Sequence, residues 1–244
     1  MHSRDRIDRH VGVAAVRDPA ASPRGSQVRA TGATGLTQPN EMMYIISKDG
    51  TMRYPAEHKQ QTRQRIVRAA ARRFRSRGAE GATIGTLMRG LRLTHGGFYK
   101  HFGNKEQLFL EAFEQSLTEV SSKAFEAVQN APPNGQAKAL IEGYLDAEHA
   151  GDVAGGCPVA ALAPEIARRP PKARNEFLRV LTKHIGTLAK YLPGGTAEER
   201  ERKARVLLSG MAGTLNMARV IVDDEQRRRF LDDATKFYLE AIRR

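Results

Sequence analysis

The chain has 244 residues, 40% of them hydrophobic and 27% charged, which is typical of globular proteins with a substantial core. Its single cysteine excludes a disulfide framework within the chain and a cysteine-rich zinc site. The formal net charge of +13 is concentrated in residues 56–107, which carry 12 basic and 3 acidic side chains, whereas residues 108–244 carry 20 and 19. A basic region beside a nearly neutral one predicts a polyanion-binding domain joined to a separate body.

Residues 1–51 are rich in Gly, Ser, Thr, Pro and Arg and show no sustained apolar period. We expect them to be disordered, because they bury too little apolar surface to offset the entropy lost on ordering. The first helical pattern begins directly after Met52–Pro55, so Met52 is a candidate for the physiological start of the protein. The alternative is a genuine disordered tail whose arginines add non-specific affinity for DNA.

The sequence does not have the pattern of an exported or membrane-spanning protein. The apolar run Val11–Val16 is too short for the core of a signal peptide. The most apolar long stretch, Val206–Val222, contains Ser209, Asn216 and Arg219 and is better interpreted as a buried helix. We therefore expect a cytoplasmic protein with no membrane partner.

A first helix is predicted over residues 56–77, where apolar side chains recur every four positions. Gly78 and Gly81 are expected to end it. The arginines of this helix are expected to form mostly a solvated face, with a few of them attracting phosphate. They are Arg63, Arg65, Arg68, Arg72, Arg73, Arg75 and Arg77.

Two short helices are predicted next, from Thr83 to Leu91 and from His95 to His101, joined by a tight turn at Arg92–Leu93. Thr83 and Thr94 are expected N-caps, because threonine hydroxyls accept hydrogen bonds from the free N–H groups of a helix start. Asn104 is expected to cap a longer helix with an apolar face. Three helices within about 50 residues, the last two joined by a tight turn, have helix-turn-helix geometry.

Residues 108–244 are predicted to be helical, with loops at proline- and glycine-rich positions. Pro158 is expected at the first position of one helix and Thr196 at the start of another. Asp223 or Asp224 is expected to cap the last helix. No segment has a convincing strand pattern, so the predicted fold class is all-α. The expected helices of this part cover residues 139–148, 159–167, 177–188, 196–222 and 223–244.

Thr83–Ile84 and, above all, the run Leu93–Leu108 (LTHGGFYKHFGNKEQL) resemble the DNA-binding domain of TetR/AcrR-type bacterial transcriptional regulators. The run Gly156–Glu165 (GCPVAALAPE) is similar to one branch of the same family. This resemblance implies an N-terminal three-helix DNA-binding domain over residues 52–107 and a C-terminal helical domain over residues 108–244. It also implies that the C-terminal domain dimerises and usually holds an effector pocket.

The expected recognition helix must present its exposed face to the major groove of DNA. Gly96 and Gly97 disfavour a helix but remove bulk, so that the backbone can approach DNA; a simple loop is the alternative. His95 can read a base edge and Lys100 suits a phosphate, and the resemblance implies that the Tyr99 hydroxyl contacts phosphate. The predicted DNA contacts are Thr83, Thr94, His95, Gly96, Gly97, Tyr99, Lys100, His101 and Lys105.

Three positions at helix ends have specific expectations. Thr83 and Lys105 stand at predicted helix N-termini, where free N–H groups favour a phosphate, although capping alone explains Thr83 equally well. Arg92 departs from the family, which commonly has glycine at this turn. If the turn requires a positive φ, a non-glycine residue costs about 1 kcal/mol. The chain then strains slightly, adopts a different turn, or uses Arg92 as a further phosphate contact.

Apolar stripes on the last two predicted helices indicate a dimer interface, and small residues within the first stripe allow two helices to approach closely. In proteins that resemble this chain, these helices pair with those of a second copy as a four-helix bundle. A two-fold dimer also fits a palindromic operator. The alternative is that both stripes face only the core of their own chain. The predicted interface residues are Val206, Gly210, Gly213, Met217, Ile221, Phe230, Ala234, Phe237 and Ala241.

The predicted effector contacts are apolar, aromatic or histidine residues of the C-terminal domain, for which plain core packing is the alternative. His149 and His184 lack metal-ligand partners at a recognised spacing, so neither a metal nor a cofactor is predicted. Cys157 is a candidate redox switch, because a helix N-terminus lowers the pKa of a thiol; a small buried residue is the alternative. The predicted effector contacts are Phe109, Phe113, Leu117, Tyr144, Phe177, Leu181, His184 and Met211.

The sequence therefore predicts a homodimeric transcriptional regulator, a repressor that a small-molecule effector releases from a palindromic operator. A non-specific architectural DNA-binding protein is the alternative, which the specific motif and the large near-neutral body disfavour. An enzyme is not expected, because the sequence lacks the HExxH, GxxxxGK and GxSxG motifs.

Overall fold

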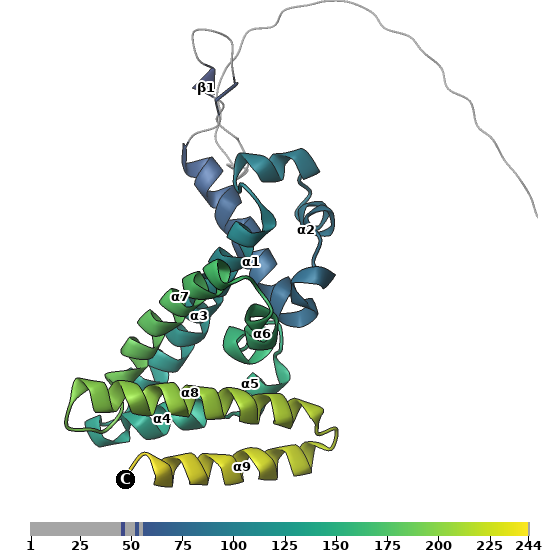
Figure 1. Cartoon of the computed structure of the whole chain (residues 1–244). Coiled ribbons are helices and arrows are strands. Elements are labelled where there is room, and N and C mark those ends of the chain that lie inside the picture. Colours follow the sequence, from purple (N-terminus) through teal and green to yellow (C-terminus); the bar gives the residue numbers. More distant parts are fainter. Residues whose placement is uncertain (1–44, 47–51, 54–55, 244) are drawn as a thin grey trace, which may run out of the picture. The chain divides into compact units, whose positions relative to one another are not determined.

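The computed structural model of the chain describes residues 45–46, 52–53 and 56–243 (Figure 1). Residues 1–51, which are predicted to be disordered, lie outside these ranges apart from Ile45–Ile46. There β1 (Ile45–Ile46) pairs antiparallel with β2 (Met52–Arg53). No strand was expected at these positions, because two residues are too few to display an alternating pattern in the sequence. Every longer element described is helical, which confirms the all-α class.

The N-terminal helices follow the predicted order, and their caps are confirmed. The side chains of Thr83, Thr94 and Asn104 each accept a hydrogen bond from the backbone N–H three residues later. Gly78 interrupts the first helix with φ 69° and ψ 171°, a conformation that favours glycine, so the predicted stop there is present as a break. The elements are α1 (Ala56–Gly81), α2 (Ile84–Gly90), the 3-10 helix η1 (His95–Lys100) and α3 (Lys105–Asn130).

The C-terminal helices differ from the prediction mainly at residues 139–148, where two helices replace one. Asp146 accepts a hydrogen bond from the Glu148 N–H (2.9 Å) and so starts a new helix. Thr196 and Asp223 cap the last two helices as predicted. The elements are the 3-10 turn η2 (Pro133–Gly135), α4 (Gln136–Tyr144), α5 (Ala147–Gly151), α6 (Pro158–Ala167), α7 (Pro171–Ala189), α8 (Ala197–Val220) and α9 (Asp224–Ala241).

Two clusters of buried apolar side chains hold these helices together. The first includes the buried rings of Phe74, Phe98 and Phe102 and joins α1, α2, η1 and the first half of α3 to α6 and α7. The second joins the end of α3 to α4 and to the helices from α5 to α9. α3 therefore belongs to both clusters and continues across the predicted domain boundary after residue 107.

α8 and α9 lie side by side as a long antiparallel pair (Figure 1). Leu215 and Leu231 are buried on their inner sides, against the second cluster.

Within the described ranges, no helix is both long enough and apolar enough to cross a membrane.

Candidate nucleic-acid interface

The turn between α2 and η1 is built around Arg92, whose φ is 58°. Leu93 donates its backbone N–H to the Met88 carbonyl (2.9 Å), which closes the end of α2. The positive φ on which the expected strain depends is therefore present at a non-glycine residue. This conformation costs about 1–2 kcal/mol for an L-amino acid. The Arg92 side chain is exposed.

The expected recognition helix is the 3-10 helix η1, which buries one side and exposes the other. Phe98 is fully buried and stacks on Phe102, with ring centroids 5.4 Å apart. Tyr99 is 59% exposed and packs edge-on against the exposed ring of His95. Lys100 is exposed as well. Three of the predicted DNA contacts thus share the outer side of one short helix.

Gly96 and Gly97 stand in different surroundings. A Cβ atom at Gly97 would lie 3.2 Å from the Thr94 hydroxyl and 3.8 Å from the Met88 methyl group, so packing inside the chain explains this glycine. A Cβ atom at Gly96 would meet no atom within 4 Å, and its φ is not positive. Nothing in the described part of the chain requires glycine at position 96, so its missing side chain leaves room for an outside partner.

Thr83 and Lys105 both stand at helix N-termini, as predicted. The Thr83 hydroxyl accepts a hydrogen bond from the Thr86 N–H (3.2 Å), so its capping role is present while the residue stays exposed. Lys105 is the first residue of α3, directly after the cap Asn104. A phosphate contact at either residue stays a prediction.

His101 differs from the other predicted contacts because it is half-buried beside Phe102. Its Nδ1 atom is buried and has no hydrogen-bond partner among the described residues. Burial, followed by the positive charges of Lys59 and Arg63, lowers the pKa of His101. In the free protein this lowering favours the uncharged ring, and a contact of His101 with DNA stays a prediction.

The arginines of α1 fall into two groups: most are exposed, as expected, and the others have partners within the fold. Arg63 pairs through both terminal nitrogens with Glu111, one of them at 2.6 Å, and Arg73 donates to the Thr86 carbonyl (3.0 Å). Arg75 is buried. The helical period could not show this, because the partners lie on elements far away in the sequence. The exposed group consists of Arg65, Arg68, Arg72 and Arg77.

The predicted dimer residues lie mostly on one exposed surface of α8 and α9, called here the α8–α9 face. Val206 is 70% exposed and Phe237 is 65% exposed. Gly210 instead packs within the chain, since a Cβ atom there would lie 2.6 Å from the Tyr238 hydroxyl. The α8–α9 face consists of Val206, Gly213, Met217, Phe230, Phe237 and Ala241, whereas Ile221 and Ala234 are half-buried.

Val220 and Val222 are also exposed and apolar, next to the end of α8. They were not among the predicted interface residues, although Val220 follows Gly213 by seven residues and Met217 by three and so shares their face of the helix. Their position at the helix end, directly before the cap Asp223, was the available signal.

The eight predicted effector contacts do not meet in one place. Phe109, Phe113 and Phe177 are buried in the first cluster, and Phe177 packs edge to face on each of the other two rings at 5.3 Å. These three rings therefore have the surroundings expected of plain core residues, which was the alternative to an effector contact. The remaining residues lie apart: Leu117 in the same cluster, Met211 in the second, Leu181 at its edge, and His184 and Tyr144 at two separate cavities.

His184 lines a shallow cavity of about 220 Å³ between α3 and α7. Its Nδ1 atom lies 3.0 Å from the Ser121 hydroxyl, which donates its own proton to the Leu117 carbonyl (2.6 Å). The ring therefore donates from Nδ1 to Ser121. Burial lowers the pKa of His184 to about 4.

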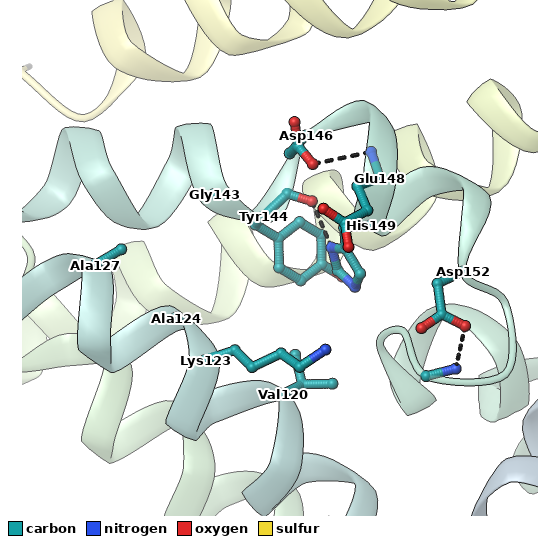
Figure 2. Close-up of a pocket in the computed structure, with 11 residues that line it drawn as sticks. Val120, Lys123, Ala124, Ala127, Gly143, Tyr144, Asp146, Glu148, His149 and Asp152 are labelled. Atoms are coloured by element: carbon teal, nitrogen blue, oxygen red, sulfur yellow. Dashed lines mark hydrogen bonds between the residues drawn. The ribbon is translucent and has the colours of Figure 1, made fainter.

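Tyr144 lines a second cavity, of about 190 Å³, called here the α3–α5 cavity (Figure 2). Val120, Ala124 and Ala127 of α3 form its apolar wall, and Asp152 comes from the loop between α5 and α6. Of these residues, only Tyr144 was among the predicted effector contacts. The others are small, aliphatic or charged, and no local pattern marks them as neighbours.

His149 also lines the α3–α5 cavity, and its hydrogen bonds define its protonation. Its Nδ1 atom lies 2.6 Å from the Tyr144 carbonyl, while Nε2 accepts a hydrogen bond from the Cys157 N–H (3.0 Å). The ring is therefore neutral, with its proton on Nδ1, and burial lowers its pKa. Both ring nitrogens of His149 therefore have hydrogen-bond partners within the fold.

Cys157 is buried, with 2% of its surface exposed, next to the Tyr144 side chain. Burial, and then the neighbouring Cys157 thiol, raise the pKa of Tyr144. A redox role for Cys157 stays a prediction.

Among the described residues, no group of three or more His, Cys, Asp and Glu is placed to hold a metal ion.

Two family models match the sequence. The model described as bacterial regulatory proteins, tetR family, matches residues 66–112, which include the turn, η1 and the start of α3. The model described as tetracyclin repressor-like, C-terminal domain, matches residues 135–233. No curated protein sequence matches the chain.

Solved structures with the same fold cover most of the described helices. A TetR transcriptional regulator from Chloroflexus aurantiacus is 24% identical, with a TM-score of 0.61 over 74% of this chain and 96% of the other. A TetR-family regulator from Cytophaga hutchinsonii is 19% identical, with a TM-score of 0.61 over 75% and 96%. FadR from Bacillus subtilis, solved in complex with stearoyl-CoA, is 14% identical, with a TM-score of 0.55 over 72% and 96%.

Replacing Arg92 by glycine should stabilise the protein, because glycine adopts a positive φ without strain. The expected gain in the free energy of unfolding is up to about 1 kcal/mol, after allowance for the greater freedom of glycine in the unfolded chain. Urea denaturation of Arg92→Gly and the wild type measures it. Arg89→Gly, one turn earlier inside α2, is the control and should destabilise. A loss of stability in Arg92→Gly would contradict the strain at this turn.

The low pKa of His184 predicts a loss of stability in acid. The unfolded side chain titrates at about 6.5. The folded one titrates at about 4. Protonation therefore favours unfolding as the pH falls through this window. Between pH 7 and 4.5 the wild type should lose about 2–3 kcal/mol more than His184→Gln, whose amide can donate to Ser121 but cannot be protonated. Urea titrations at fixed protein concentration measure this difference, and equal losses would show that His184 is not buried as a neutral ring.

Proposed function

Because the chain belongs to the TetR family of bacterial regulatory proteins, and is a DNA-binding transcriptional regulator, we propose that it is a repressor of its target genes. It binds a palindromic operator as a homodimer in the cytoplasm, and a small-molecule effector releases it. The observation that carries the DNA-binding part is Gly96, an exposed glycine that no contact within the described chain requires.

The surroundings of Gly96 support a close approach of DNA. His95, Tyr99 and Lys100 are exposed on the same short helix and supply hydrogen-bond donors for base edges and phosphates. Residues 56–107 carry 12 basic and 3 acidic side chains, so this domain attracts a polyanion as a whole. The exposed arginines of α1 add to that attraction, while the recognition of sequence rests on η1.

The α8–α9 face supports a homodimer. Val206, Met217 and Phe237 are large apolar side chains that a monomer would leave in water. A groove of about 380 Å³ between the two helices, lined by Val206, Phe237 and Ile242, can receive side chains of a second copy. Two-fold pairing of this face places two copies of η1 for the two halves of a palindrome.

The α3–α5 cavity supports an effector site in the C-terminal domain. It has an apolar wall from α3 and polar groups from the α5–α6 loop, which is the usual lining of a small-molecule site. Its volume of about 190 Å³ is below the range of about 300–1,000 Å³ that is typical for drug-sized ligands. We propose a small effector, in contrast to the stearoyl-CoA held by the FadR neighbour.

Release requires that the effector bind one conformation of the dimer more tightly than the DNA-bound one. Thermodynamic linkage makes this coupling reciprocal. The effector lowers the affinity for the operator by the same factor by which the operator lowers the affinity for the effector. A change in the spacing of the two recognition helices is sufficient, because a palindrome demands a defined spacing of its half-sites.

Gly96→Ala should weaken DNA binding without harming the fold. The added methyl group meets no atom of the described residues within 4 Å and so should obstruct only the approach of DNA. The Kd should therefore rise about tenfold, equivalent to about 1.4 kcal/mol. Fluorescence anisotropy on a duplex that the wild type selects from a random pool measures this, and failure to select an inverted repeat would contradict the proposed function.

Two variants serve as controls for Gly96→Ala. Gly186→Ala in α7, where a Cβ atom also meets nothing within 4 Å, should leave DNA affinity unchanged. Gly97→Ala should lower the melting temperature instead, because its Cβ atom crowds the Thr94 hydroxyl. Wild-type affinity in Gly96→Ala would refute a close approach of DNA at this residue.

Phe237→Glu should break the dimer, because it buries a charge in the proposed apolar interface. We expect the dimer dissociation constant to rise at least about a hundredfold, since an unpaired buried charge costs several kcal/mol. Analytical ultracentrifugation measures it. Lys236→Glu, on the polar side of α9 beside Asp233, is the matched control and should remain dimeric. A fully dimeric Phe237→Glu protein would place the interface elsewhere.

A further inference from the structure

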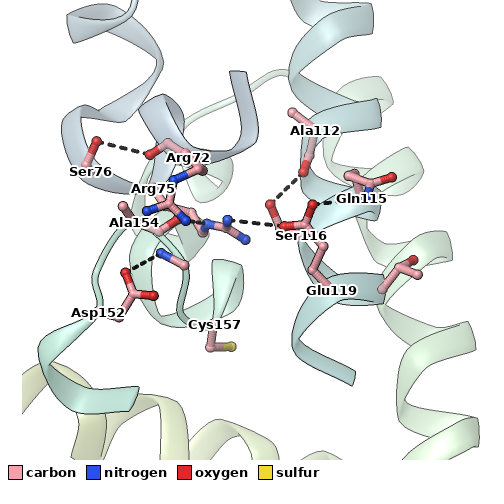
Figure 3. Close-up of polar contacts among 12 residues, drawn as sticks. Arg72, Arg75, Ser76, Ala112, Gln115, Ser116, Glu119, Asp152, Ala154 and Cys157 are labelled. Carbon is pink, nitrogen blue, oxygen red and sulfur yellow. Dashed lines mark hydrogen bonds and ion pairs between the residues drawn. The ribbon is translucent and has the colours of Figure 1, made fainter. Parts of the chain in front are cut away.

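Arg75 is the one arginine of α1 whose side chain is fully buried in the described structure. Its Nε atom donates to the Ala154 carbonyl at 2.6 Å, and Nη2 lies 3.4 Å from the Glu119 carboxylate (Figure 3). Nη1 is buried with no partner among the described residues. Burial lowers the pKa of Arg75, and Glu119 opposes that effect. Because this buried guanidinium has few partners, losing its hydrogen bond to the Ala154 carbonyl would leave a buried charge largely unpaired, which is energetically costly.

Ala154 lies in the loop of residues 152–157, which connects α5 to α6 and is tightly closed. Asp152 accepts a hydrogen bond from the Gly155 N–H (2.7 Å), and the Cys157 N–H donates to His149. A Cβ atom at Gly156 would lie only 2.6 Å from the Asp152 carbonyl oxygen, so the chain is packed on itself there. The loop should therefore move as a unit, and a shift of Asp152 should carry Ala154 with it.

The same loop forms part of the wall of the α3–α5 cavity. Asp152 and Gly155 line that cavity together with the α3 residues Val120 and Ala124, and Figure 2 shows Asp152 across the cavity from α3. This loop thus lines the cavity and also contacts Arg75, a buried arginine on α1 of the DNA-binding domain (Figure 3).

We propose that this loop regulates DNA binding: a ligand in the α3–α5 cavity displaces Asp152 and Gly155, and the Ala154 carbonyl then withdraws from Arg75. The inference rests on the proposed function, in which that cavity takes the effector. Once the hydrogen bond to the Ala154 carbonyl is lost, the buried guanidinium of Arg75 keeps only its contact with Glu119 at 3.4 Å. α1 must then shift so that the guanidinium finds another partner or water. α1 packs along α3, the helix that follows the recognition helix, and a shift of α1 therefore changes the placement of η1.

A competing route runs through α6 itself. Glu165 of α6 accepts a hydrogen bond from the Ala79 N–H (2.9 Å) directly after the break in α1 at Gly78. This contact does not involve Arg75, so substituting Arg75 separates the two routes.

The experiment replaces the ligand by a side chain that fills the cavity. Ala124→Phe is made in the wild type and in Arg75→Met, whose unbranched apolar side chain reaches as far as the arginine Nε and needs no hydrogen bond. The Kd for the selected duplex should rise at least about fivefold with Ala124→Phe in the wild type and less than about twofold in Arg75→Met, since allosteric couplings are typically 5–150-fold. Gln129→Phe, exposed on the same helix and outside the cavity, is the control and should change nothing.

An equal effect of Ala124→Phe in both backgrounds would overturn the role of Arg75 and assign the coupling to Glu165. No effect in the wild type would overturn the coupling as a whole. Thermal melting checks that each variant is folded; Arg75→Leu, which also needs no hydrogen bond, and Ala127→Phe replace a variant that does not fold.

Hydrogen exchange without DNA separates this inference from the proposed function. Ala124→Phe should speed the exchange of the Gly155 and Cys157 amide protons at least about fivefold, because both amides donate bonds that hold the loop. Unchanged exchange would overturn the displacement of the loop, whatever the protein binds. If exchange speeds up while the wild type selects no inverted repeat, the proposed operator binding fails and the movement of the loop stands.

Discussion

The buried ring of Phe109 joins the two parts of the chain, and much of the arrangement depends on it. It lies on α3 and packs edge-on against Phe74 of α1, at 5.0 Å between centroids, and against Phe177 of α7, at 5.3 Å. The guanidinium of Arg169 lies 4.1 Å from the centre of the same ring. Such contacts bury large apolar areas with a preferred geometry, so α1, α3 and α7 meet at one point. Any movement of α3 therefore reaches both the DNA-binding helices and the C-terminal domain.

The positive charge of the N-terminal domain serves two physical purposes. Exposed arginines such as Arg68 and Arg72 remain in water, where they contribute to the field that attracts a polyanion. Arg63 and Arg75 are instead paired with groups on other elements, Glu111 of α3 and the Ala154 carbonyl. Within one helix, the same residue type thus contributes to the attraction of DNA at some positions and to the joining of elements at others.

The ends of the helices could be predicted well, because the signals for them are local. Thr94, Asn104, Thr196 and Asp223 each accept a hydrogen bond from an N–H group three residues later, and such a bond needs no distant partner. The errors are also local in origin. The strand at Ile45–Ile46 is too short to show a period, whereas the predicted short helix of residues 95–101 is present as the 3-10 helix η1.

The sequence by itself determined the all-α class, the helix-turn-helix and the position of the strained turn at Arg92, since each depends on residues close together along the chain. Only the tertiary structure decided which predicted residues share a site. It placed Phe109 and Phe113 in the core, Tyr144 at a cavity, and Arg75 against a loop 79 residues away in sequence. The physical reason is that periodicity shows which residues share a face of a helix, whereas the packing of distant helices decides what covers that face.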